Sequence, residues 1–496
     1  HRDLHSFPTR RSSDLNGATY SLPLTISAPT TLRVRCFKTG EVPSPTVCHT
    51  YLVAQSAARR SIPAISVVGD PVFTFYGPNA VTSPTNGQGI MAIKGGGYTN
   101  AMWENFGDTS AFNVPMLRGR SSEKPVSFEY YPTNGNPLRT ELGLRISGSN
   151  HARPRYKLTT APALRFTPTD FTQKPSFNIF FRNELGESPQ DYTFFPDSKV
   201  TKFEDMRLRA GKNDIANPFI RDEFARRVYL GTGQEGSLGN IVSLYINGIW
   251  KGYYNFCEHL RQAFMQQHHN STAAWDVQQV NEFASGDSIH WNRTIAYLRT
   301  NALTEVNAYL GVADYLDVDN YIDYIVVNSY AGMWDWPNNN WVAAHERSDA
   351  GRWRFYMWDA EGCFGGTGRT NDYNTFTSDL IIPDAKTTTS RYIPAIYTLL
   401  RVSPEFRLRF ADRAPQHLFH GGCLTRESLD RTFFTLCDTV NPIMKETGNG
   451  TVNATFYTNW IYKIDRRTNY FNQLVAQNIW PRSEEHTSEL QSHLNL

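Results

Sequence analysis

Residues 333–365 read MWDWPNNNWVAAHERSDAGRWRFYMWDAEGCFG and predict a β-hairpin with polar side chains at its open end. The runs WVAA and WRFYMW have strand composition, and the Ser-Asp-Ala-Gly between them is typical of a turn. Because a hairpin returns the chain to the edge where it started, we expect Asp335, Asn340 and Asp359 to converge. Two carboxylates and a carboxamide that converge indicate a metal site or an acid–base site.

A helix is predicted immediately before the hairpin. Asp317 stands where a capping side chain begins a helix, and Gly332 is a typical stop. Between them, apolar residues recur with the spacing of one helix face: Val318, Ile322, Ile325 and Val326.

The residue types around the hairpin suit metal-assisted chemistry. A hard divalent cation such as Mg²⁺ takes a few oxygen ligands and completes its shell with water and substrate phosphate oxygens. Asn340 and Asp359 supply such oxygens, which leaves Asp335 available as a general base. The spacing of these three residues around a strand pair is that of a protein-kinase catalytic loop and its metal-binding aspartate.

Two positions depart from that kinase pattern. Trp334 stands where an arginine usually precedes the catalytic aspartate, and Asp-Ala-Glu at residues 359–361 replaces Asp-Phe-Gly. A plain turn is the alternative explanation of the polar run, because Asp, Asn and Pro are common turn formers.

Both ends of the chain resemble translated sequencing adapters: HRDLHSFPTRRSSDL at residues 1–15 and RSEEHTSELQSHLNL at residues 482–496. We exclude them from the fold and expect the native part, about residues 16–481, to be a fragment whose upstream signal peptide is lost. Removing the ends takes four of the 49 basic and five of the 47 acidic residues, so the native charge is nearly balanced. This balance predicts no nucleic-acid partner, and no apolar run is long enough to span a membrane.

Six cysteines are too few and too scattered for a metal-binding pattern. Cys36 with Cys48, and Cys423 with Cys437, would pair in an oxidising compartment. Isolated buried thiols are the alternative for all four.

Three native segments are predicted. Residues 16–55 are expected to form a partial β-sandwich accessory module, residues 56–120 a linker and β-rich extension, and residues 121–481 the catalytic domain. The passage TLRVRCFKTGEVPSPTVCHTYLV resembles the C-terminal-like β-module of chitobiases and β-hexosaminidases, which accompanies polysaccharide-active enzymes.

The G-x-G-x-x-G run at residues 231–236 is predicted to be a surface loop, because a helix precedes it and a strand follows. A phosphate-binding loop has the reverse order.

Several blocks, in family order, resemble the spore coat protein H (CotH) kinase family over about residues 125–472. These blocks are LRISGSNHARPRY, QKPSFNIFFRNELG, MRLRAGKNDIANPFIRDEF, LYINGIWKGYYNFCEHL, WDV with SGD, WDWPNNNW and WRFYMWDAEGCFG.

The resemblance implies an atypical α+β kinase fold with two lobes, a β-rich N-lobe and a helical C-lobe. It implies a secreted or cell-surface enzyme that uses ATP and Mg²⁺, with Mn²⁺ as the alternative ion. The enzyme would transfer the γ-phosphate to serine or threonine of protein substrates, among them proteins associated with the cell wall or with polysaccharides.

Residue roles follow from the same resemblance. Asp335 would accept the proton of the acceptor hydroxyl, while Asn340 and Asp359 hold Mg²⁺ on the phosphates. Asn339 and Glu361 are candidates for a second ligand or an orienting group.

A cation from the N-lobe is also expected at the phosphates. Lys174 fits because it lies just before a predicted strand, and Asp222 or Glu223 is the expected acidic partner of the lysine. A solvated lysine at a strand edge is the alternative.

Further candidates are weaker. Arg153, Arg155 and Arg221 could contact phosphate through their fork geometry. Glu258 is placed where the nucleotide base or ribose would lie, although a helix N-terminus also favours an acid.

Two other functions stay open at this point. Two carboxylates beside a polysaccharide-associated module also suit glycoside hydrolysis. A non-catalytic surface protein that keeps the kinase-like scaffold is the second alternative.

Overall fold

The computed structural model describes residues 18–76, 89–91, 118–148, 174–211, 220–365, 369–447 and 465–479. The chain divides into two compact units, His1–Gln55 and Ser56–Leu496. Both adapter-like ends lie outside the described residues.

The first unit contains an antiparallel strand pair, β1 (Thr30–Val34) and β2 (Val47–Tyr51), in which Thr30 lies opposite Tyr51. These two strands are what the structure describes of the predicted β-module. The six cysteines are free thiols. Cys423 and Cys437 are buried, as the second of the two alternatives above predicts, whereas Cys36 is exposed and Cys48 is half-buried.

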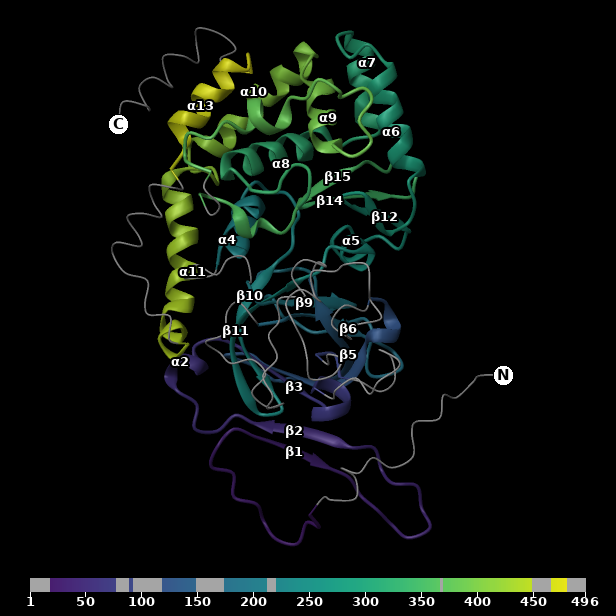
Figure 1. Cartoon of the computed structure of the whole chain (residues 1–496), viewed down its shortest axis with the longest axis vertical. Helices are drawn as coiled ribbons and strands as arrows, with labels where there is room; N and C mark the ends of the chain where they lie inside the picture. The colour runs from purple at the N-terminus through teal and green to yellow at the C-terminus, as the bar shows by residue number, and fades with distance from the viewer. Residues whose placement is uncertain are drawn as a thin grey trace, which may run out of the picture. The chain divides into compact units, whose positions relative to one another are not determined.

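The first part of the second unit is a closed barrel with strand order β10-β11-β9-β6-β5-β4-β3 (Figure 1). Its strands are β3 (Ala64–Val68), β4 (Lys124–Tyr131), β5 (Leu138–Ser147), β6 (Ser176–Phe181), β9 (Asp205–Arg209), β10 (Gly239–Ile246) and β11 (Ile249–Glu258). The neighbours are antiparallel except β3 and β10, whose parallel pairing closes the barrel. Alternate residues of each strand fill the interior, among them Phe177, Met206 and Phe256. A small strand pair, β7 (Gln190–Asp191) with β8 (Lys202–Phe203), lies outside the barrel.

The later part of the second unit combines a four-stranded sheet, order β13-β12-β14-β15, with most of the helices. The strands are β12 (Trp275–Gln279), β13 (Glu282–Ser285), β14 (Trp341–Glu346) and β15 (Arg354–Met357). The helices of the unit are α2 (Ala57–Arg60), α4 (Arg221–Leu230), α5 (Gln262–His268), α6 (Ile289–Thr300), α7 (Val306–Leu310), α8 (Val318–Ala331), α9 (Tyr392–Leu400), α10 (Pro404–Leu418), α11 (Arg426–Glu446) and α13 (Arg467–Ala476). The fold is therefore mixed α+β, as the sequence predicts, and its two-lobed arrangement stays a prediction.

Helix α8 forms where the sequence predicts it. The Asp317 side chain accepts a hydrogen bond from the backbone N–H of Asn320, and Gly332 ends the helix in the left-handed conformation. Tyr324 and neighbouring residues of the helix are fully buried, so α8 is a central element of the core. The chain leaves this fixed helix only three residues before Asp335.

No helix within the described part of the chain is long and apolar enough to cross a membrane.

Candidate active site

The two ends of the predicted hairpin meet. Strands β14 and β15 pair with Trp341 opposite Met357. Beyond that pair, the Nδ2 of Asn340 donates a hydrogen bond to the Asp359 carbonyl at 3.1 Å, and the N–H of Trp334 donates to the Gly362 carbonyl at 2.9 Å. The structure thus joins Asn340 to Asp359, and it joins the residue before Asp335 to Gly362.

Asp335, Asn340 and Asp359 share an unusual backbone conformation, with φ of 61°, 55° and 55°. Asp and Asn tolerate this left-handed region better than other non-glycine residues. Such positions gather at functional sites, where the surrounding structure holds them in place. Here the anchor is Trp336, which is buried and donates from Nε1 to the Tyr324 hydroxyl on α8 at 2.7 Å.

Each of the three polar side chains retains an oxygen that could serve chemistry. Asn339 donates from Nδ2 to Oδ1 of Asp335 at 2.9 Å, and Arg209 donates to Oδ1 of Asp359 at 2.6 Å. In the described residues, the second carboxylate oxygens of Asp335 and Asp359 and the Oδ1 of Asn340 have no hydrogen-bond partner. Asn340 and Asp359 therefore fit a divalent cation by donor type, and Asp335 fits a general base.

Arg209 on β9 holds the acidic side of the site together. Its guanidinium contacts Asp222 at 3.2 Å, Asp359 at 2.6 Å and Glu361 at 2.8 Å. Burial opposes the charge on Arg209, but the three carboxylates outweigh burial and raise its pKa well above its usual value. Sequence reasoning gave this arginine no role. The alternation of Met206 and Leu208 with arginines would have revealed a strand with two cations on one face.

Asp222 fixes the segment that follows Asp359. Its Oδ1 accepts from the Ala360 N–H at 2.9 Å, and its Oδ2 accepts from Arg226 at 3.1 Å. Burial raises the pKa of Asp222, but Arg209 and Arg226 outweigh burial and lower it overall. Asp222 thus pairs with arginines, where the sequence had assigned it to Lys174.

Glu223, the other expected partner of Lys174, belongs to a buried network on α4. Arg227 donates to its Oε1 at 2.8 Å, and Asn255 on β11 donates to its Oε2 at 2.9 Å. A cavity of about 10 Å³, the size of one water molecule, is lined by Glu223, Asp222, Glu361 and neighbouring residues.

Lys174 is fully buried. Its Nζ donates to the Tyr253 carbonyl at 2.7 Å and lies 4.2 Å from the centre of the Tyr254 ring. Burial lowers the pKa of Lys174 to about 7. The solvated-lysine alternative is excluded for this side chain.

The shifted pKa of Lys174 predicts a pH-dependent stability. Between pH 7 and about 10, the unfolded chain binds a proton on this lysine that the folded chain does not, so the free energy of unfolding rises with pH by up to about 1.4 kcal/mol per unit. Below pH 7 both states are protonated and the contribution is constant. In urea denaturation, we expect the free energy of unfolding of wild type, minus that of Lys174→Met, to increase from pH 7 to 10. A parallel dependence in the two proteins, like that expected for exposed Lys386→Met, would contradict this.

The remaining predicted residues lie as follows. Glu258 is buried at the end of β11, where its Oε2 accepts from the Leu238 N–H at 2.9 Å and its Oε1 lies 2.8 Å from Nε2 of His268. Arg221 begins α4, next to Asp222. Arg153 and Arg155 lie outside the described residues.

Other polar clusters do not extend the site. Asp276, His290 and His345 place ligand atoms within 4.8 Å of one another. However, the two imidazoles stack at 4.4 Å with 20° between their planes, so their in-plane lone pairs do not point at a common cation. Asp276 also accepts from Arg347 at 2.6 Å, so the cluster serves to tie β12, β14 and α6 together.

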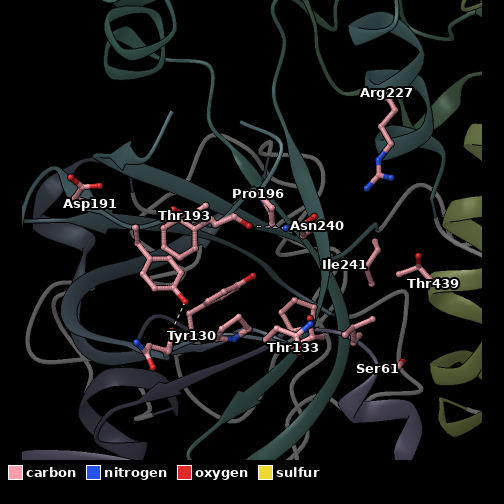
Figure 2. A pocket seen from close by; sticks show the side chains of 18 residues that line it. Ser61, Tyr130, Thr133, Asp191, Thr193, Pro196, Arg227, Asn240, Ile241 and Thr439 are labelled. Atoms are coloured by element: carbon pink, nitrogen blue, oxygen red, sulfur yellow. Dashed lines mark hydrogen bonds between the residues drawn. The ribbon is translucent and has the colours of Figure 1, made fainter. Parts of the chain in front are cut away.

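A cavity of about 810 Å³ lies at one side of the barrel, and no described residue of the predicted site lines it (Figure 2). The Asn240 side chain at this cavity donates to the Phe194 carbonyl at 2.9 Å, and the Tyr192 hydroxyl donates to the Asn136 carbonyl at 2.7 Å. These polar groups already have partners within the wall.

Comparison with known proteins gives the family. No curated protein matches the chain. Among solved structures, the chain is similar to the proinflammatory kinase CtkA from Helicobacter pylori, with 11% identity and a TM-score of 0.26, over 59% of this chain and 90% of that one. The model of the family described as CotH kinase protein matches residues 167–474, more than half of the 496 residues. This chain therefore belongs to the CotH kinase protein family.

Proposed function

We propose that the chain is an atypical protein kinase that transfers the γ-phosphate of ATP to serine or threonine hydroxyls with the help of Mg²⁺. The family is one of kinases, which implies ATP and a divalent metal in general. The observation that carries the proposal is the hydrogen bond that joins Asn340 to Asp359, beside the backbone bond from Trp334 to Gly362. Asp335, Asn340 and Asp359 each keep an oxygen that no described residue occupies.

The side chains would divide the work of phosphoryl transfer as follows. Asp335, oriented by Asn339, would accept the proton of the acceptor hydroxyl. Asn340 and Asp359 would hold the cation, which when bound neutralises charge on the phosphate oxygens. Arg209 positions Asp359 and Glu361, and Asp222 fixes the backbone between them.

The proposal also covers where the protein acts and which proteins it modifies. The likeness of the first unit to a module of polysaccharide-active enzymes supports an extracellular or cell-surface protein. Its protein substrates would include proteins associated with the cell wall or with polysaccharides.

Incubation of the protein with Mg²⁺ and ATP, followed by intact-mass measurement, tests the proposed reaction. We expect a mass increase of one or more phosphoryl groups on the chain itself or on an added acceptor protein. A nucleotidyl adduct would replace the proposal with a different transfer reaction. Release of sugar from polysaccharide without nucleotide would favour the glycosidase alternative, and no product of either kind would favour the scaffold alternative.

A further inference from the structure

A row of cations crosses the outer face of the barrel. In the strand register, Arg145 on β5 lies opposite Asn178 on β6, which lies opposite Arg207 on β9. Neighbours of these residues along each strand, such as Leu144 and Met206, point into the barrel core. By the alternation of a strand, the arginines therefore lie on the opposite, outward face.

A third arginine joins this row where β11 ends. Arg261 donates from Nε to Nε2 of His259 at 3.2 Å, and the Nδ1 of His259 lies 2.7 Å from Oδ1 of Asp205. Burial and the field of nearby arginines, Arg207 first, lower the pKa of His259 well below its usual value. His259 is thus a neutral spacer, and it adds no charge.

The arginines of this cluster differ in the ion pairs that they form within the described residues. Arg182, at the edge of the cluster, is neutralised by two hydrogen bonds to Glu123, at 2.7 and 3.0 Å. By contrast, Arg145, Arg207 and Arg261 form no ion pair with any residue the structure describes. Three carboxylates lie within electrostatic reach of these arginines without an ion pair to them: Asp205, on which all three act, Glu123 near Arg145 and Asp359 near Arg207.

The contacts that the three arginines do make leave donors unused. Arg145 donates from Nη1 to the Gly119 carbonyl at 3.2 Å, and its buried Nε has no partner among the described residues. Arg207 donates to Asn178 at 3.1 Å and lies 4.3 Å from the centre of the Trp358 ring. Partly desolvated cations that form no ion pair cost stability, and a bound anion would offset that cost.

The cluster adjoins the proposed catalytic centre. Trp358, which Arg207 covers, directly precedes Asp359 in the chain, and Arg209 lies 5.9 Å from the same ring. Asp205, Arg207 and Arg209 follow one another at every second position of β9, so they occupy one face of one strand.

We propose that Arg145, Arg207 and Arg261 form a polyphosphate-binding site that holds the phosphate chain of the nucleotide. The inference rests on the proposed kinase function and replaces Lys174 in the role of phosphate cation. Guanidinium groups suit this role, because their planar fork binds two phosphate oxygens at once. The ammonium group of Lys174, in contrast, donates to the Tyr253 carbonyl and lies over the neighbouring aromatic ring.

Calorimetric titration of the full chain with inorganic tripolyphosphate, with adenosine and with ATP, without metal, tests this site. We expect wild type to bind tripolyphosphate, and Arg207→Gln and Arg261→Gln each to weaken that binding by about tenfold or more, the size of one charge-assisted contact. Adenosine binding should not change. Arg293→Gln, which alters an exposed arginine on α6, is the matched control and should bind all three ligands like wild type.

Melting temperatures show whether each variant folds as stably as wild type. Arg261→Gln is the safer variant, because the side chain of this arginine forms a hydrogen bond only with His259 among the described residues. Unchanged tripolyphosphate affinity in both variants, or no tripolyphosphate binding by wild type, would overturn the arginine site. Tripolyphosphate binding through these arginines without any phosphoryl transfer from ATP would instead leave the anion site standing and overturn the proposed kinase function.

Discussion

Replacing Asp335 by asparagine is expected to slow phosphoryl transfer by about 10²- to 10⁴-fold, the usual contribution of a general base. Asparagine keeps an oxygen that can accept the hydrogen bond from Asn339, and it tolerates the φ of 61° at this position. The fold and nucleotide binding should therefore survive. Single-turnover rates with γ-labelled ATP at saturating Mg²⁺ measure the effect.

The matched control for this substitution is Asp349→Asn. Asp349 lies exposed between β14 and β15, away from the convergent end of the hairpin, so the same chemical change there should leave the rate unaltered. A wild-type rate in Asp335→Asn would mean that another group accepts the proton or that none is needed.

Replacing Arg209 by methionine is expected to destabilise the protein by about 3–5 kcal/mol, because removal of one partner from a buried ion pair leaves uncompensated charge. Three carboxylates share this guanidinium, and its side chain is only 10% exposed. Urea denaturation followed by tryptophan fluorescence measures the loss.

A second substitution separates charge from packing in this cluster. Adding Glu361→Gln to Arg209→Met removes one of the carboxylates that have lost their cation, so the double variant should recover part of the lost stability. Exposed Arg293→Met should cost no more than about 0.5 kcal/mol. An Arg209→Met protein as stable as that control would show that the carboxylates do not depend on Arg209.

Local patterns were sufficient to predict the helix and the two strands around the candidate site. The cap at Asp317, the stop at Gly332 and the strands on either side of the turn are set by neighbouring residues, and the structure has them within a residue or two of the expected bounds. A hairpin also dictates where its own ends go. The approach of Asn340 to Asp359 followed from chain geometry alone.

Contacts between segments far apart in the sequence could not be predicted from local patterns. The parallel pairing of β3 with β10 closes the barrel across more than 170 positions, and no local periodicity encodes it. Lys174 was assigned to phosphate from its place before a strand, but packing turns its amine to the Tyr253 carbonyl. Arg209 takes Asp222 instead, because β9 and α4 come together only in the folded chain.

The account depends on one divalent cation with its nucleotide being held by Asn340 and Asp359. The most direct test is the thermal-shift response to Mg²⁺ with ATP in wild type, Asp359→Asn and the Asp349→Asn control. Asparagine suits the φ of 55° at position 359 while it removes the carboxylate charge. We predict metal-dependent stabilisation by ATP in wild type and in the control, and its loss in Asp359→Asn. Equal metal-dependent stabilisation of Asp359→Asn, or none in wild type, would contradict the account.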